Sequence, residues 1–308
     1  MQNETERIAF YFPNPAQCDL AGTTDLCIAA HPDDIELMAY PAIYACREDA
    51  ARGFVGLVLT DGAGAAAGEC LKNLSRAQKA AVRAKEQRRA AELGGYLAVG
   101  LLGCSSEEVK AQQRFVVSAV EEVLRCCRPE RVYIHNPADK HDTHVAASIA
   151  AITALRALPE ALRPKRVYGM EVWRSLDWLT DDDKTVFDRY GDPELERSLI
   201  TVFGSQIAGH KRYDEGVLGR RAANAVFLSG YEKDQAAGAC YAMDMTGEIF
   251  AGLPVREMIG RRIDRFKEDA IGRIDRLSGA EDTLPLLVCG VNRSGRTERP
   301  GGEFLSFA

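Results

Sequence analysis

Two short segments of this chain hold most of the side chains that could bind a metal ion or transfer a proton. Residues 30–36 read Ala-His-Pro-Asp-Asp-Ile-Glu, and residues 132–144 contain His135, His141 and His144. Four of the chain's five histidines therefore lie in these two segments. Histidines that lie on the surface without a function would be spread more evenly along the chain. This clustering therefore indicates a shared chemical role.

His31, Asp34 and His144 together suit a catalytic zinc ion. Such an ion takes three protein ligands from histidine and carboxylate side chains and keeps a fourth position open for water, whose pKa it lowers. Asp33 is then free to accept a proton from the attacking water. His141, if protonated, could face the developing oxyanion or the leaving group. One zinc ion per chain is expected, although iron, cobalt or manganese also suits these ligands.

Each segment also has a simpler interpretation. The first could be only a turn that leads into a helix cap, because Asp is favoured at N-caps and Pro at first helical positions. His141 and His144 could lie at a solvated helix start. Since both segments follow apolar strands, the metal hypothesis explains them together, whereas each simpler interpretation explains one. His135 ends a strand, where it could simply bond to the backbone, so its role stays open.

The elements that must position these residues alternate between strand and helix. Apolar runs predict strands at 26–30, 55–60, 97–102, 132–135 and 167–172. Helices are expected between them, up to about residues 52, 94, 127 and 158. Capping-box spacings at 75–78 and 105–108 mark the starts of two of these helices. This order predicts an α/β fold with a Rossmann-like, mainly parallel sheet, helices on both faces and a ligand site at the carboxyl ends of the strands.

Composition indicates a globular protein in a reducing compartment. The chain is 46% hydrophobic and carries a net charge of −6 at pH 7, which argues against nucleic acid as a partner because no basic stripe would offset phosphate repulsion. No apolar run is long enough to span a membrane, and the first residues lack a signal-peptide pattern. The nine cysteines are odd in number and include no Cys-x-x-Cys pair, so reduced thiols and a cytoplasmic location are expected.

The two motifs resemble those of the PIG-L/LmbE-type de-N-acetylases, zinc enzymes with a Rossmann-like fold that remove acetyl from N-acetylglucosamine-containing compounds. Further matches are Thr60-Asp61-Gly62, Gly68-Glu69, Arg83-Ala84-Lys85-Glu86 and Leu93-Gly94. The resemblance implies that His31, Asp34 and His144 bind zinc. It also implies that Asp33 is the general base and that His141 assists the oxyanion or the leaving amine.

The chain departs from the family pattern in two places. The usual His-Pro-Asp-His is here His141-Asp142-Thr143-His144, which leaves Asp142 without an assigned role. Many members carry a histidine shortly before a later Ser-Gln pair, whereas here Ser205-Gln206 precedes His210. A different substrate shape is the simplest explanation. The resemblance is specific over residues 26–150 and thin beyond residue 215.

Six residues are expected to contact the substrate: Asp61, Arg83, Asp139, Trp173, Lys211 and Arg212. Asp61 could bind sugar hydroxyls from a glycine-rich loop at 61–68, and Trp173 could stack on a sugar ring beyond the last strand. Lys211 and Arg212 suit a polyol or a phosphorylated substrate. Trp173 could equally belong to the core, and the segment 205–214 could be a solvated helix start.

These observations predict a zinc-dependent amidohydrolase that releases acetate from an N-acetylated amino sugar, whether free, phosphorylated or conjugated. The partner would then be a small-molecule or glycoconjugate substrate. An amidohydrolase of a non-sugar N-acyl compound and a non-catalytic sugar-binding protein on the same fold are the alternatives. Residues 1–215 are expected to form the deacetylase domain, and residues 216–308 a helical extension packed on it. That extension includes a charged amphipathic helix at 253–277, and a homo-oligomer is left open.

Overall fold

The computed structural model describes residues 8–64, 71–112, 114–187, 191–209, 212–228 and 236–278, together with two short strands near the C-terminus. The chain forms two compact units, Met1–Ile263 and Asp264–Ala308. This boundary differs from the expected one at residue 215, because the segment after residue 215 contributes a strand to the sheet of the first unit. The expected amphipathic helix is present as α11 (Val255–Ser278).

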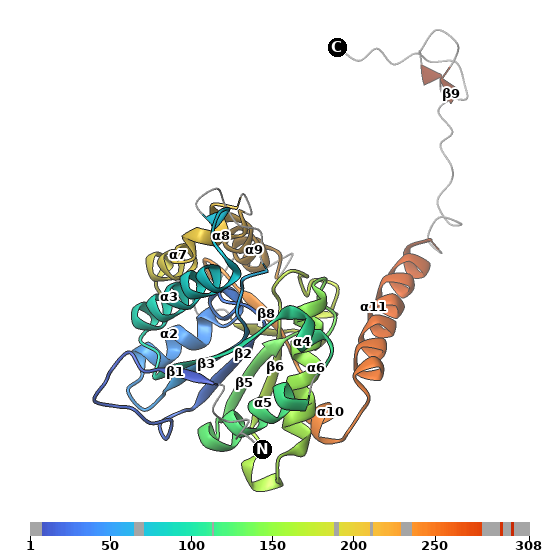
Figure 1. The fold of residues 1–308 in the computed structure, drawn as a ribbon. Coiled ribbons are helices and arrows are strands. Elements are labelled where there is room, and N and C mark those ends of the chain that lie inside the picture. Colours follow the sequence, from blue (N-terminus) through green and yellow to red (C-terminus); the bar gives the residue numbers. More distant parts are fainter. Residues whose placement is uncertain are drawn as a thin grey trace. The chain divides into compact units, whose positions relative to one another are not determined.

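The first unit is built on an eight-stranded sheet with the order β1-β4-β3-β2-β5-β6-β8-β7 (Figure 1). Its strands are β1 (Ala9–Tyr11), β2 (Asp25–Ala29), β3 (Phe54–Thr60), β4 (Ala98–Cys104), β5 (Arg131–His135), β6 (Arg166–Met170), β7 (Thr185–Phe187) and β8 (Cys240–Asp244). The five neighbouring strands β4, β3, β2, β5 and β6 run parallel. Strand β1 pairs antiparallel with β4, and β8 pairs antiparallel with both β6 and β7. The predicted mainly parallel, Rossmann-like sheet is confirmed.

Strands β2 and β5 meet where the order of the sheet reverses. From β2 the chain moves outward through β3 and β4, and it then returns to place β5 on the other side of β2, with Leu26 opposite Val132. Open α/β sheets bind ligands beyond the carboxyl ends of the strands at such a switch point. The two polar motifs of the sequence follow β2 and β5, so the topology brings them together.

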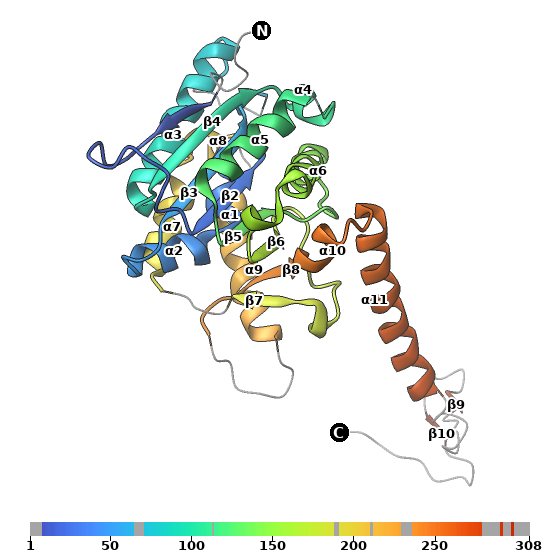
Figure 2. The ribbon, with the colours of Figure 1, turned by 90° about the horizontal axis from the view of Figure 1, so that it is seen from below.

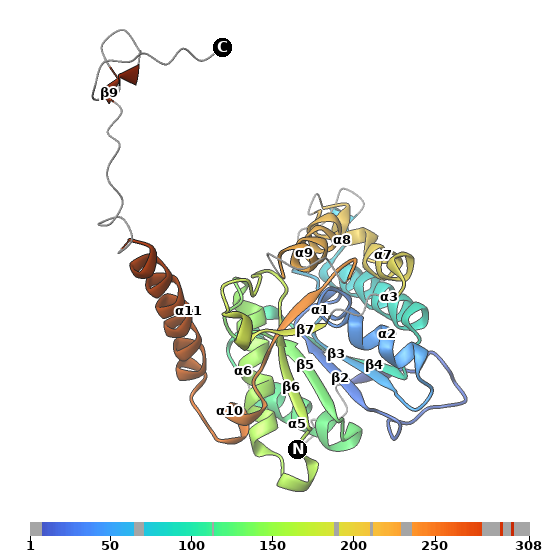
Figure 3. The same cartoon turned by 180° about the vertical axis from the view of Figure 1, so that it is seen from behind.

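Helices cover both faces of the sheet (Figure 1, Figure 3). They are α1 (Asp34–Met38), α2 (Tyr40–Glu48), α3 (Arg76–Gly94), α4 (Ser106–Lys110), α5 (Arg114–Cys127), α6 (Asp142–Ala157), α7 (Pro193–Thr201), α8 (Gly204–Ile207), α9 (Tyr213–Phe227) and α10 (Thr246–Phe250). Single 3-10 turns lie at Glu160–Leu162 and Asp181–Asp183, and the strands near the C-terminus are β9 (Gly290–Val291) and β10 (Thr297–Glu298).

Alternate side chains of β2 pack on opposite faces of the sheet, and helices cover both faces. Leu26 and Ile28 pack in one apolar core with residues of α5 and α6. Cys27 and Ala29 pack in a second core with residues of α1, α2, α3 and α7. All five residues of β2 are buried, as a strand covered on both sides requires.

Two expected helices are each interrupted. The helix expected up to residue 52 breaks at Ala39, where φ is −111° and ψ is 16°, because Pro41 follows in the first turn of α2 and cannot donate a backbone hydrogen bond. The helix expected over 105–127 divides into α4 and α5. Both capping boxes, at Ser75 and Ser105, are present.

The seven described cysteines are all free thiols, as expected. Within the described part of the chain, no helix is both long and apolar enough to cross a membrane.

Candidate metal centre and catalytic site

His31, Asp34 and His144 converge beyond the carboxyl ends of β2 and β5. The Nδ1 atom of His31 lies 3.0 Å from Asp34 Oδ2 and 3.2 Å from His144 Nε2, and the latter two atoms are 3.3 Å apart. A tetrahedral zinc ion with bonds near 2.0 Å sets its ligand atoms about 3.3 Å from one another. The three donor atoms therefore have the spacing of ligands around one ion, and their mixture of imidazole and carboxylate fits such an ion.

The turn that carries Asp33 and Asp34 is held from several sides. Asp33 has a φ of 103°, in a region that few residues other than glycine adopt. Its backbone N–H donates to Gln87 of α3, the Pro32 carbonyl accepts from the Gln206 side chain of α8, and the His31 N–H donates to Asp34 Oδ2. These contacts fix a strained turn in which consecutive carboxylates have different surroundings.

Glu36, the third carboxylate of the motif, lies apart from the metal cluster. It is fully buried, and its Oε1 atom accepts hydrogen bonds from Gln87 and from the Tyr96 hydroxyl. Burial raises the pKa of Glu36 to about 8, so this side chain is largely protonated at neutral pH. Glu36 therefore supports the turn through Gln87 and adds no ligand to the cluster.

Asp139 lies on the far side of His144. Its Oδ1 atom is 3.6 Å from His144 Nδ1, and its two oxygens accept the backbone N–H groups of His141 and Trp173. Burial alone would lower the pKa of His144, but Asp34 and Asp139 outweigh it and raise that pKa to about 9. A bound metal ion would replace this proton. Asp139 is 7% exposed, and these contacts favour a positioning role over the expected contact with substrate.

His135 uses its Nε2 atom for the backbone. That atom accepts the Ala30 N–H at 2.9 Å and lies 3.4 Å from Asp34 Oδ2. The ring stacks on His144 with centroids 4.0 Å apart. Asp34, His135 and His144 form a second group with metal-ligand spacing, as do His31, His141 and His144. Because the Ala30 N–H already occupies the nitrogen that faces Asp34, we favour His31 as the ligand.

Asp33 lies in the wall of the site, with 7% of its surface exposed. Burial and the adjacent Asp34 carboxylate raise the pKa of Asp33 well above its usual range. Tyr213, at the start of α9, lines the same cavity, and burial together with Asp33 raises the pKa of its hydroxyl. Tyr213 lies in the polar segment noted in the sequence but was not among the expected site residues.

His141 stands at the exposed edge of the site, with its ring centroid 4.9 Å from that of His31. Burial, His144 and His31 lower the pKa of His141 to about 4. The ring is therefore neutral at pH 7 and would donate a hydrogen bond without carrying the positive charge considered from the sequence. Asp142 begins α6 and is exposed, whereas Thr143 is buried.

A cavity of about 480 Å³ opens onto these residues. Its lining includes His31, Asp33, Asp34, Gly62, Gly64, Arg76, Ser106, Glu107, Lys110, Lys140, His141, Thr143, Trp173, Gln206 and Tyr213. Of the expected substrate residues that the structure describes, Trp173 is thus the one in this lining. Arg76, Lys110 and Lys140 were not expected in the site, since isolated cations on helices and loops are usually solvated.

The other expected substrate residues lie elsewhere. Arg83 is 1% exposed and donates to the Ser205 hydroxyl, which links α3 to α8. Asp61 lies beside the cavity and pairs with Arg76 at 2.7 Å. Arg212 pairs with Asp214 and Glu215. Lys211 falls outside the described residues, as do His210 and Gly68-Glu69.

Residues 26–155 match the family described as PIG-L: GlcNAc-PI de-N-acetylase. The resemblance noted from the two motifs is thereby confirmed over this range. No curated protein matches the sequence with significance.

Solved structures share the fold. An N,N'-diacetylchitobiose deacetylase from Pyrococcus horikoshii aligns with a TM-score of 0.58 and 21% identity over 74% of this chain and 85% of its own. GalB, the 4-carboxy-2-hydroxymuconate hydratase of Pseudomonas putida KT2440, gives 0.53 and 18% over 72% and 95%. The A40926 pseudoaglycone deacetylase Dbv21 gives 0.51 and 15% over 73% and 97%. At these identities the similarity shows the fold alone, so the activity must be argued from the site.

Proposed function

We propose that this protein is a zinc-dependent hydrolase that removes the acetyl group from an N-acetylated amino sugar of the N-acetylglucosamine type. The products are acetate and the free amine. The observation that carries the proposal is the cluster of His31, Asp34 and His144, with donor atoms 3.0 to 3.3 Å apart, beside Asp33 in the wall of a cavity. The family match over residues 26–155 supports the reaction class.

His31, Asp34 and His144 would hold the metal ion. When bound, zinc polarises a carbonyl group and lowers the pKa of water. The chain's own groups then move the protons. Asp33 accepts a proton as the water oxygen bonds to the acetyl carbon, and the raised pKa of Asp33 favours its holding that proton. Asp33 gives the proton to the nitrogen as the carbon–nitrogen bond breaks.

His141 would stabilise the oxyanion that develops on the acetyl oxygen. Its neutral ring can donate one hydrogen bond from the edge of the cavity. Trp173, in the same lining, would pack against a sugar ring. Asp139 accepts the backbone N–H groups of both His141 and Trp173, so one buried carboxylate fixes the positions of these two residues relative to each other.

The test is acetate release from N-acetylglucosamine, its 6-phosphate and N,N'-diacetylchitobiose. The full chain is stripped of metal with a chelator and then reloaded with zinc. We expect release only after reloading, with one equivalent of zinc bound. Acetate release from a panel of non-sugar N-acetyl amines, but not from the sugars, would identify an amidohydrolase of a non-sugar N-acyl compound. Sugar binding without acetate release would identify a non-catalytic sugar-binding protein. Zinc bound at one equivalent without release from any sugar would contradict the proposed function.

A further inference from the structure

Three cationic side chains, Arg76, Lys110 and Lys140, line the cavity beside the metal cluster. Among the described residues of that lining, Glu107 is the one acidic residue apart from Asp33 and Asp34 at the cluster. Away from the metal cluster, three cations therefore face one carboxylate in this lining, whereas the whole chain has a net charge of −6. Cations gathered in a concave site attract anionic ligands.

Two of these cations form weak ion pairs with carboxylates. Arg76 lies 2.7 Å from Asp61, and Lys110 lies 3.5 Å from Glu107, with more than two-fifths of both cationic side chains exposed. Such exposed pairs are worth about 0–1 kcal/mol, so a ligand anion can compete for them. Lys140 is exposed and has no ion pair among the described residues. Its ammonium group is therefore the most available cation of the three.

The fold places Lys110 and Lys140 on neighbouring elements. Lys110 ends α4, and Lys140 directly precedes His141, the N-cap of α6. Helix α4 packs against α6, as Figure 2 shows, and Gln112 fixes the contact by donating to the Ala146 carbonyl at 2.7 Å. Gln112 itself has a φ of 52°, which lets the chain turn sharply after α4.

Three other lining residues are neutral and two of them are aromatic. Trp173 follows β6, and Gln206 and Tyr213 come from α8 and α9; none of these three carries a charge. The cations thus come from the end of α4, the residue before the α6 N-cap and the first residue of α3, and these neutral or aromatic groups come from other elements. A ligand with a neutral ring and a separate anionic substituent would match both parts. The cavity volume of about 480 Å³ lies within the range of small-molecule sites.

We propose that the substrate carries an anionic substituent, a phosphate ester or a carboxylate, in addition to its N-acetylated sugar, and that Lys140 binds this group with support from Lys110 and Arg76. This inference rests on the proposed function for the placement of the acetamide at the metal cluster. It adds a specificity determinant that acts on the substituent and leaves the reacting atoms untouched.

The experiment compares Lys140→Gln with the wild-type chain on matched substrates. N-acetylglucosamine is the neutral probe, its 1-phosphate and 6-phosphate are the phosphate probes, and its carboxymethyl glycoside is the carboxylate probe. We expect the wild-type zinc-loaded protein to prefer one anionic probe, and Lys140→Gln to lower kcat/KM for that probe roughly tenfold, mainly through KM. The kcat/KM for the neutral probe should fall much less, so the ratio of the anionic to the neutral value drops.

Lys165→Gln is the matched control, because Lys165 is exposed and pairs with Glu130 at the opposite end of the sheet. It removes the same charge and should leave every kcat/KM unchanged. Equal kcat/KM values for the neutral and anionic probes in both proteins would overturn the inference.

A binding measurement separates this inference from the proposed function. Calorimetry with glucosamine 6-phosphate, glucosamine 1-phosphate and glucosamine requires no turnover. If no probe releases acetate but an amino-sugar phosphate binds and loses roughly tenfold affinity in Lys140→Gln, the anion site stands and the deacetylase fails. If neither these phosphates nor the carboxymethyl glycoside of glucosamine bind more tightly than glucosamine, the anion site is wrong, whatever the activity.

Discussion

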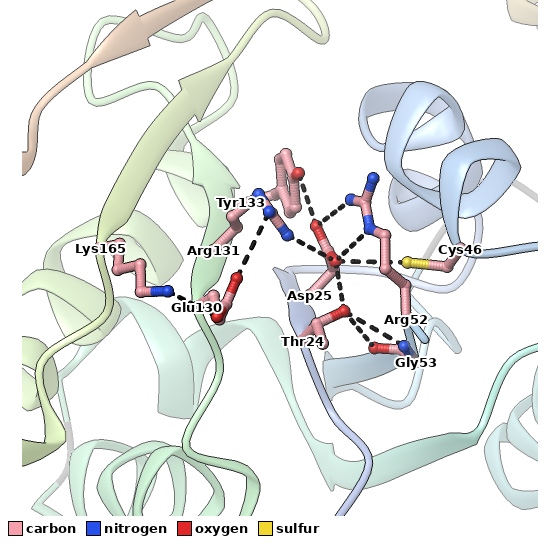
Figure 4. Close-up of polar contacts among 9 residues, drawn as sticks. All are labelled: Thr24, Asp25, Cys46, Arg52, Gly53, Glu130, Arg131, Tyr133 and Lys165. Carbon is pink, nitrogen blue, oxygen red and sulfur yellow. Dashed lines mark hydrogen bonds and ion pairs between the residues drawn. The ribbon is translucent and has the colours of Figure 1, made fainter. Parts of the chain in front are cut away.

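Strand β2 begins with one buried aspartate, Asp25, and leads into another, Asp33, and the two carboxylates have opposite surroundings. Asp25 is fully buried and accepts hydrogen bonds from Arg52, Arg131, Tyr133 and Thr24 (Figure 4). Burial would raise the pKa of Asp25, but the hydrogen bonds from Arg52 and Thr24 outweigh it and lower that pKa. At Asp33, burial and the Asp34 carboxylate raise the pKa.

The difference lies in the partners and hardly in burial, since both side chains are less than a tenth exposed. A carboxylate that is surrounded by cationic and hydroxyl donors is stabilised in its charged form and serves stability. A carboxylate beside another carboxylate holds a proton more readily and can take part in proton transfer. We therefore expect mutations at the two ends of β2 to separate stability from activity.

The largest effect is expected for Asp33→Asn. We expect the rate of acetate release to fall by about 10²- to 10⁴-fold, because the amide cannot accept the proton. Zinc stoichiometry, measured by elemental analysis, should remain that of the wild type. The free energy of unfolding should be equal or higher, because the repulsion with Asp34 is removed. Near-normal turnover with zinc bound would exclude Asp33 as the base.

Asp25→Asn should give the reverse pattern. It leaves the two arginines without their buried partner, and we expect the free energy of unfolding in urea to fall by about 3 kcal/mol. The side chains of Arg52 and Arg131 are 23% and 33% exposed and can partly regain water, which keeps the loss at the lower end of the range for buried pairs. The rate per folded molecule should not change. The exposed Asp182→Asn is the control, and equal stability of the two variants would contradict the comparison.

Asp139→Asn tests a carboxylate that neither accepts the reaction's proton nor anchors the sheet. Asp139 acts on the site through its neighbours. Groups that orient a metal ligand typically contribute 10- to 100-fold to metal affinity. We expect a zinc Kd about tenfold higher in competition with a chelator, because the amide loses its charge attraction for His144. Asp142→Asn, three residues along and exposed, should leave the Kd unchanged. A wild-type Kd in Asp139→Asn would remove the proposed positioning role.

The smallest effect is a pH dependence of stability that belongs to Asp25. Its pKa in the folded chain lies below the ordinary value of 3.8, so the unfolded chain binds the proton more readily. The stabilisation from Asp25 is therefore complete above about pH 4 and is lost as the pH falls through the folded pKa. Urea unfolding between pH 3 and 6 should show a shallower acid loss in Asp25→Asn than in the wild type. Parallel curves would assign the acid sensitivity to other groups.

The central fold could be predicted from the sequence because its signals are local. Buried parallel strands appear as apolar runs, and the side chains of both capping boxes bond to backbone within the same turn. The edge strands β1 and β7 have three residues each, too few to show a period. Strand β8 lies in the segment that was read as a helical extension, and only its pairing with β6 reveals its place.

Some residues of the candidate site could likewise be predicted from the sequence, and others could not. His31, Asp34 and His144 could be selected because their residue types are unusual together and they follow strands. Lys110 and Tyr213 reach the cavity only through the packing of α4 and α9, which no local pattern encodes, whereas Lys140 lies within the second motif but is of a residue type that is usually solvated. Arg83 carries the opposite lesson: its motif matched the family, yet the structure uses its charge to link two helices.

The switch point between β2 and β5 also has a consequence for how the chain acquires its site. His31 and His144 are separated by 113 positions, and they meet only after β5 has paired with β2 across the intervening β3–α5 segment. A nascent chain that ends before β5 holds only two of the three donor atoms, those of His31 and Asp34. Ion capture would therefore require the pairing of β5 with β2 and would stabilise it, so metal uptake during synthesis would report that this central pairing has formed.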